Sequence, residues 1–426
     1  MVRQKLMVML LVAGMFSSVC AGNPFSHYFE KKTLRFDFII GGNAETINIL
    51  PVQIKQESLW SGSLAMNGEW LDYGTLRYSL FDERGENLLY RRGFTSLFQE
   101  WQHTPEATDK YRAFYQALHM PFPLHPIRLV IEERTLEGQF EPIFQTSINP
   151  EDYFIIREQT EIPDITWLHR GGDFSEAVDL VFLAEGYTLE ERSLFIDDAQ
   201  NLTDYLFSVQ PFSDNRENFN VGALFTASPE SGTDIPHRGV YANTLFGSTF
   251  STFDMERYLT VSDMRAVYDA LAGVEWDTFF VLVNSEEYGG GGFYNFMGVG
   301  TARHPVSNKV FIHELGHSFA GLADEYYTSH VAFDLPLKPG VEPWEPNITT
   351  LVDFDKKWSN MLDPGTPIPT PRIPHFEGTL GVFEGGGYRE KGIFSPAMDC
   401  RMKSNNASGF CQVCQRAIQQ MIDSYR

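Results

Sequence analysis

Two patterns of hydrophobic and polar positions divide the chain. From residue 34 to about residue 154, apolar and polar residues alternate in short runs, most clearly over residues 34–40. A period of two is typical of half-buried strands, and turns between the runs, such as residues 82–85, predict an antiparallel β-sandwich. Residues 105–119 depart from the alternation, so we expect a helix there between the strands.

The second half of the chain has longer apolar runs that alternate with helical patterns. This arrangement predicts a mixed or largely parallel sheet backed by helices. The expected strands cover residues 178–183, 219–226 and 278–284, and the expected helices cover residues 189–208 and 253–272. Between the two halves, residues 158–172 are polar and contain Pro163 and a Gly-Gly pair, which is typical of a linker.

The N-terminus has the pattern of a secretory signal peptide. Arg3 and Lys5 precede an apolar run, which ends in small residues up to Ala21. Secretion is favoured over lipoprotein anchoring through Cys20, because Val19 fits poorly the small residue expected before a lipidated cysteine. The chain is therefore expected to be an exported α+β multidomain protein. Its expected parts are a signal peptide (1–21), a β-sandwich accessory domain (22–157), a linker (158–172) and an α/β catalytic domain (173–426).

One helical segment carries a metal-binding pattern. Residues 308–326 contain His313-Glu314-x-x-His317, and apolar side chains form one face of the expected helix. Histidines four positions apart lie one turn apart on the same face, so both imidazoles can reach one metal ion. Glu314 lies between them, where it can take a proton from a metal-bound water without being a ligand.

A third ligand is expected soon after the two histidines. Asp324 can reach the ion either on a continuous helix or after a bend at Gly321. A carboxylate oxygen is an acceptable third zinc ligand and leaves one position open for water. Glu325 is the competing carboxylate.

A glycine-rich stretch precedes this helix at residues 289–301. Four consecutive glycines disfavour regular structure, while residues 293–299 have the pattern of an edge strand. An exposed edge beside a metal site could pair with an extended peptide through main-chain hydrogen bonds. A flexible loop before a strand is the alternative.

The formal net charge of −23 narrows the set of partners. An acidic surface repels phosphate backbones and anionic lipid, so binding to nucleic acid or to an anionic membrane is not expected. No segment after the N-terminal one reaches the roughly 18 apolar residues of a membrane span. We expect a monomer with one catalytic zinc ion. Calcium binding at the acidic turn of residues 230–234 has no further support.

Three cysteines remain after the expected cleavage: Cys400, Cys411 and Cys414. In an exported protein, a disulfide that closes the C-terminal loop is favoured, with one thiol left over. A zinc knuckle at Cys411-x-x-Cys414 is the alternative, although the sequence shows no clear second pair of ligands.

The sequence HELGHSFAGLADEY from His313 resembles the signature of the bacterial IgA-peptidase-type metallopeptidases, a metzincin-like family of zincins. The spacing between His317 and Gly321 is one residue longer than in the common metzincin pattern, and Asp324 stands where that pattern has a third histidine. The stretches GVFEGGGY, FSPAMDCRM and FCQVC fit the same family, and RRGFTSLFQEW from Arg91 resembles its accessory domain. The resemblance implies a metzincin-like catalytic domain with a methionine turn at Met402, Met398 being the second choice. It also suggests Tyr388 as a stabiliser of the oxyanion.

These features together predict a secreted zinc endopeptidase that acts on proteins or peptides. Host immunoglobulin and other glycoproteins are candidate substrates. A catalytically degenerate zincin that binds host protein or glycan is the alternative, and a zinc amidase acting on cell-wall peptide would share the same site chemistry.

Overall fold

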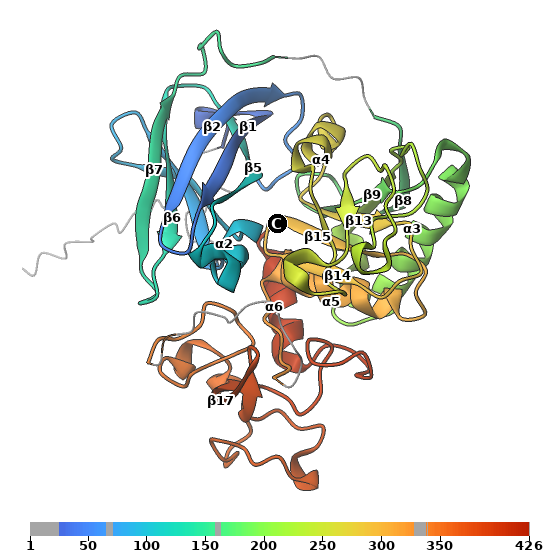
Figure 1. Cartoon of the computed structure of the whole chain (residues 1–426). Coiled ribbons are helices and arrows are strands. Elements are labelled where there is room, and N and C mark those ends of the chain that lie inside the picture. The colour runs from blue at the N-terminus through green and yellow to red at the C-terminus, as the bar shows by residue number, and fades with distance from the viewer. Residues whose placement is uncertain (1–24, 65–70, 158–162, 328–337, 339, 426) are drawn as a thin grey trace, which may run out of the picture.

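The computed structural model describes residues 25–64, 71–157, 163–327, 338 and 340–425. The expected signal peptide and Cys20 lie outside these residues. The N-terminal part begins with the short helix α1 (Phe25–Tyr28) and forms two antiparallel sheets beside a larger mixed sheet (Figure 1). The C-terminal hairpin, β16 (Phe383–Gly386) and β17 (Arg389–Ser395), lies below both.

The two N-terminal sheets pack face to face around one apolar core. The first has the order β2-β1-β5, from Ile47–Glu57, Phe29–Gly42 and Arg112–Pro123. The second has the order β4-β3-β6-β7, from Leu88–Phe94, Leu76–Asp82, Ile127–Arg134 and Phe140–Ile148. Alternate residues of β1, including Phe36 and Phe38, enter the core with Leu80 and Leu129 of the second sheet. The predicted antiparallel alternation is therefore present.

The prediction of a helix at residues 105–119 is wrong. A 3₁₀ turn covers Pro105–Thr108, and strand β5 begins at Arg112. β5 pairs with β1 along its length, with Phe36 opposite Leu118. Partners distant in sequence thus decide the structure of a segment whose own propensity is helical. A short helix, α2 (Leu97–Gln102), lies before this segment and is capped by the Ser96 side chain.

The second half contains a six-stranded sheet of order β14-β15-β13-β9-β10-β8. Four strands are parallel, β9 (Val178–Glu185), β10 (Phe219–Leu224), β13 (Thr278–Val283) and β15 (Met297–Thr301). The antiparallel edges are β14 (Gly290–Phe293) and β8 (Ile165–Arg170). The three predicted buried strands are confirmed. β8 occupies residues 165–170 of the expected linker, so those residues belong to a sheet instead.

Helices cover both faces of this sheet. On one face, α3 (Arg192–Leu206), α5 (Ser307–Ala320) and α6 (Gln412–Asp423) share a core with Phe182 and Phe280. On the other face, α4 (Met264–Leu271) packs with Val181, Val281 and Leu97 of the N-terminal part. The helix expected at residues 253–272 is confirmed only over α4. Ahead of it, β12 (Thr260–Val261) pairs with β11 (Ser248–Thr249).

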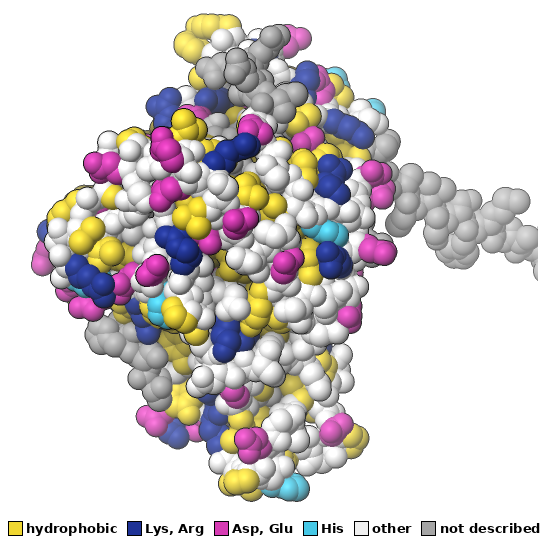
Figure 2. Space-filling view, turned by 90° about the vertical axis from the view of Figure 1, so that its right-hand side faces the viewer, with side chains coloured by type: hydrophobic (Ala, Val, Ile, Leu, Met, Phe, Trp, Pro, Cys, Tyr) yellow, Lys and Arg dark blue, Asp and Glu magenta, His cyan; other side chains and the backbone are white. Residues whose placement is uncertain are grey.

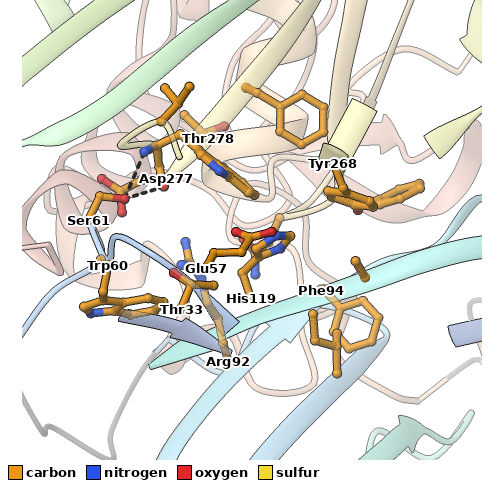
Figure 3. Close-up of a pocket in the computed structure, with 18 of the residues that line it drawn as sticks. Thr33, Glu57, Trp60, Ser61, Arg92, Phe94, His119, Tyr268, Asp277 and Thr278 are labelled. Carbon is orange, nitrogen blue, oxygen red and sulfur yellow. Dashed lines mark hydrogen bonds between the residues drawn. The ribbon is translucent and has the colours of Figure 1, made fainter. Parts of the chain in front are cut away.

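Polar contacts join the two halves of the chain. Arg35 of β1 donates from Nη1 to Asp269 Oδ1 of α4 at 2.8 Å, and Ser61 donates to the carbonyl of Trp276 at 2.6 Å. Arg92, His119 and other side chains line a cavity of about 60 Å³ at this junction (Figure 3). Its size suits a few water molecules, so we do not regard it as the functional cleft.

On the face in Figure 2, basic side chains are scattered among acidic and apolar ones, without a continuous basic patch. Within the described residues, no helix is long and apolar enough to cross a membrane.

Candidate metal centre

Helix α5 presents both predicted histidines on one face. Val310, Phe311 and Leu315 are buried against the sheet, so the helix position is set by its apolar side. The opposite side carries His313 and His317, whose Nε2 atoms lie 3.1 Å apart. Spacing by one helical turn therefore brings the two rings together as expected.

Backbone carbonyls orient both imidazoles. His313 donates from Nδ1 to the carbonyl of Arg401 at 3.0 Å, and His317 donates from Nδ1 to the carbonyl of Leu322 at 2.6 Å. A carbonyl oxygen can only accept, so each Nδ1 carries a proton, and in the neutral imidazole each Nε2 has the lone pair that a metal ion would bind. This is the arrangement that orients a histidine for metal binding.

A left-handed turn brings Asp324 to the histidines. Gly321 ends α5 with φ of 63°, and its N–H donates to the carbonyl of His317 at 3.0 Å. Such a φ favours glycine, because a side chain would be strained there. Asp324 Oδ1 then lies 3.1 Å from His313 Nε2 and 3.3 Å from His317 Nε2. The bend, not a continuous helix, is what delivers the carboxylate.

These three atoms form a nearly regular triangle suited to one metal ion. Tetrahedral zinc with ligands at about 2.0–2.1 Å places neighbouring ligand atoms about 3.3–3.4 Å apart. Asp324 Oδ1 is buried and has no hydrogen-bond partner among the described residues. Two imidazole nitrogens and one carboxylate oxygen are acceptable zinc ligands, so the residues present fit a metal ion.

Electrostatics at the triangle favour a cation. Burial alone would raise the pKa of Asp324, but the positive charges of His317 and His313 in their protonated forms hold it well below its usual range. Burial lowers the pKa of His317, and the Asp324 charge outweighs that effect, raising the pKa to about 9. The carboxylate thus stays ionised and attracts positive charge, from a proton or a metal.

Glu314 and the triangle line a cleft of about 610 Å³, a size typical of ligand sites. Burial raises the pKa of Glu314. Three glycines of β14, the strand at the edge of the sheet, also line the cleft: Gly290, Gly291 and Gly292. The prediction that residues 293–299 form the edge is therefore wrong: a turn follows Phe293, and β15 lies inside the sheet.

Close packing against α5 explains why this strand is glycine. A Cβ on Gly292 would lie 2.4 Å from the carbonyl oxygen of Glu314 and 2.8 Å from His317 Cβ. A Cβ on Gly290 would lie 2.7 Å from Glu314 Oε1. The glycines therefore allow the edge strand to approach the helix that carries the metal-site residues.

Two further predicted residues also lie at this centre. Met402 is fully buried, and its Sδ would be 2.8 Å from a Cβ on Gly316, so the sulfur packs against α5 at the residue before His317. Tyr388 donates from its hydroxyl to Asp324 Oδ2 at 2.5 Å. The tyrosine therefore contacts the carboxylate.

The N-terminal part contributes a cleft residue that sequence reasoning missed. Glu100 of α2 lines the cleft and accepts a hydrogen bond from the Tyr258 hydroxyl. Burial raises the pKa of Glu100 to about 8, even though the tyrosine bond lowers it, so the carboxyl is largely protonated at neutral pH. Glu100 lies in the stretch RRGFTSLFQEW, but nothing local to that stretch shows that it faces α5.

The expected disulfide is absent among the described cysteines. Cys400, Cys411 and Cys414 are all free thiols, and the sulfurs of Cys400 and Cys414 are 3.7 Å apart. Glu325, the competing third ligand, points to these thiols: Cys414 Sγ donates to its Oε1 at 3.2 Å.

Comparison with known families covers most of the chain. The family described as IgA Peptidase M64 matches residues 166–378 and 372–422, and the Peptidase M64 N-terminus matches residues 24–145. None of the curated proteins matches the chain.

Proposed function

The chain belongs to the IgA peptidase M64 family, and on this basis we propose that it is an exported, monomeric, zinc-dependent endopeptidase. Membership of this family implies a metallopeptidase that acts on protein substrates. The catalytic domain is proposed to be metzincin-like, with Met402 as the buried methionine of its turn. Residues 22–157 are proposed as the accessory domain and residues 173–426 as the catalytic domain.

The observation that carries this proposal is the triangle of His313 Nε2, His317 Nε2 and Asp324 Oδ1 with Glu314 in the same cleft. The three residues of the triangle would hold the zinc ion. A bound zinc ion would polarise the scissile carbonyl and lower the pKa of the attacking water. Glu314 takes a proton from that water and delivers it to the leaving amine.

The edge strand supports an extended peptide as the substrate. Among the described residues, β14 forms the edge of the sheet beside β15, and its other side has one isolated bridge, between Gly290 and Tyr258. We propose that the rest of this edge pairs with a substrate backbone. The cleft is also lined by Ser96, Glu100 and Arg134 from the N-terminal sheets and their helix. Both halves of the chain would therefore contact a protein substrate. Host immunoglobulin and other glycoproteins are proposed as substrates to test first.

The test is proteolysis of a protein panel, immunoglobulin A included, by the wild-type protein and by Glu314→Ala. Loss of the general base is expected to lower kcat/KM by at least about 10²–10⁴-fold. Zinc content of the variant should stay at the wild-type value, because Glu314 is not a ligand. Glu190→Ala, at an exposed glutamate, is the matched control and should cleave as the wild type does.

Chelation followed by restoration of zinc should remove and then return the activity. A wild-type protein that cleaves nothing in the panel, or a Glu314→Ala variant that cleaves equally well, would contradict a peptidase role. Retained binding of a panel protein without cleavage would instead support the alternative of a degenerate binding module. The intact triangle favours the enzyme.

A further inference from the structure

A second group of metal-ligand side chains lies outside the catalytic triangle. Its members, Glu325, Cys400, Cys411 and Cys414, come from the loop after α5, the turn before Met402 and the start of α6. One ligand atom from each lies within 4.8 Å of those of the others. Cys400 and Cys414 are 1% and 0% exposed, and Glu325 is 0% exposed.

The distances suit four ligands around one ion. Two sulfurs that each lie 2.3 Å from tetrahedral zinc are about 3.8 Å apart, and a sulfur and a carboxylate oxygen are about 3.5 Å apart. Cys400 Sγ and Cys414 Sγ are separated by 3.7 Å. The sulfurs of Cys414 and Cys411 lie 3.2 Å and 4.0 Å from Glu325 Oε1. A disulfide would instead require a sulfur separation of about 2.05 Å.

The surroundings of Glu325 also point to a missing positive charge. Asn347 donates from Nδ2 to Glu325 Oε1 at 3.0 Å, but Oε2 is buried and has no partner within the part of the chain that the structure describes. A buried carboxylate oxygen without a hydrogen bond is costly unless a cation satisfies it. The backbone N–H of Cys411 donates to Cys400 Sγ at 3.2 Å, a contact that would also stabilise a metal-bound thiolate.

We propose that Glu325, Cys400, Cys411 and Cys414 bind a second zinc ion, in a closed site with a structural role. Four protein ligands leave no position for water or substrate, which is the arrangement of structural zinc sites. Three thiolates make the site selective for a soft metal ion over calcium or magnesium. This role goes beyond the proposed peptidase activity, because none of the four residues belongs to the catalytic triangle.

The position of the group explains what the second ion would do. Glu325 directly follows Asp324, and its N–H donates to the carbonyl of Met402 at 2.8 Å. Cys400 directly precedes Arg401, whose carbonyl accepts the Nδ1 proton of His313 at 3.0 Å. An ion that joins these two loops would fix the position of Asp324. It would also fix the Arg401 carbonyl, which orients His313.

The decisive experiment leaves the cysteines intact. The double variant His313→Ala/His317→Ala, which lacks two catalytic ligands, is purified with zinc in the medium and its metal is measured by mass spectrometry. We expect two zinc ions per chain in the wild type and one in the double variant. After replacement of zinc by cobalt, the double variant should show thiolate-to-cobalt charge-transfer absorption. A double variant without zinc and without this absorption would overturn the proposal.

The reciprocal variant is Cys414→Ser, which should lose the second ion and its cobalt–thiolate absorption and should unfold at lower temperature. Alkylation of the denatured wild-type protein should label Cys400, Cys411 and Cys414 without prior reduction. A protected pair that becomes reactive only after reduction would show a disulfide and overturn the proposal. Failure of the peptidase function is distinguishable, because the cysteine-bound zinc would remain in a chain that cleaves nothing.

Discussion

Replacement of Tyr388 by phenylalanine tests whether its hydroxyl acts on the metal ligand. The hydroxyl donates to Asp324 Oδ2 at 2.5 Å, while the N–H groups of Gly387 and Tyr388 donate to the carbonyls of Asp324 and Tyr326 at 2.8 and 3.1 Å. The ring is therefore placed by the backbone, and Tyr388→Phe keeps the ring while it removes the hydrogen bond to the carboxylate. A hydrogen bond to a charged group contributes about 1.5–3 kcal/mol.

This free energy sets the expected loss of metal affinity. Removal of a group that orients a metal ligand typically weakens metal binding by about 10–100-fold, in the same range as 1.5–3 kcal/mol. Competition with a zinc-binding dye should show that increase in the zinc dissociation constant. At saturating zinc, kcat should fall by much less. Tyr288→Phe, whose hydroxyl lines the same cleft but contacts Asn405, is the control.

The opposite pattern would refute the reasoning. A tyrosine that stabilises the oxyanion would leave zinc affinity unchanged in the Tyr388→Phe variant and lower kcat by about 10²–10³-fold at any zinc concentration. That result would restore the role that the resemblance to the family suggests for Tyr388.

Two further predictions concern packing and pH. Gly292→Ala should destabilise the fold by about 1–3 kcal/mol and lower kcat/KM, because the new Cβ meets the helix backbone. Thermal unfolding measures this loss of stability. The control is Gly409→Ala, which should be tolerated because its Cβ would lie 3.8 Å from Val209. Equal unfolding temperatures of the two variants would contradict the prediction. Burial, followed by the charge of Asp277, raises the pKa of Asp179 above its ordinary 3.8. The folded state therefore binds a proton that the unfolded state releases, and stability falls as pH rises from 3.8 through neutrality. The urea unfolding midpoint of Asp179→Asn should fall less steeply with rising pH than that of the wild type. Parallel plots of midpoint against pH for the two proteins would contradict this explanation.

Patterns local in sequence predicted the parts of this protein that local geometry controls. His313, Glu314 and His317 lie within two turns of one helix, so the helical repeat places both imidazoles on one side wherever α5 packs. The apolar runs of β9, β10 and β13 were readable because burial on both faces leaves a continuous hydrophobic stretch. The alternation in the N-terminal strands follows equally from having one face in a core.

Contacts between distant segments decided the rest. Residues 112–119 form a strand because β1 offers them a partner, and a run of glycines forms the sheet edge because α5 leaves no room for side chains. Asp324 and Glu325 are chemically alike neighbours, yet the left-handed turn at Gly321 sends one to the histidines and packing sends the other to the cysteines. Sequence alone determined which groups were available for metal chemistry. Only the tertiary structure determined which carboxylate meets which ligands, because that choice depends on chain segments more than 70 residues apart, such as Glu325 and Cys400.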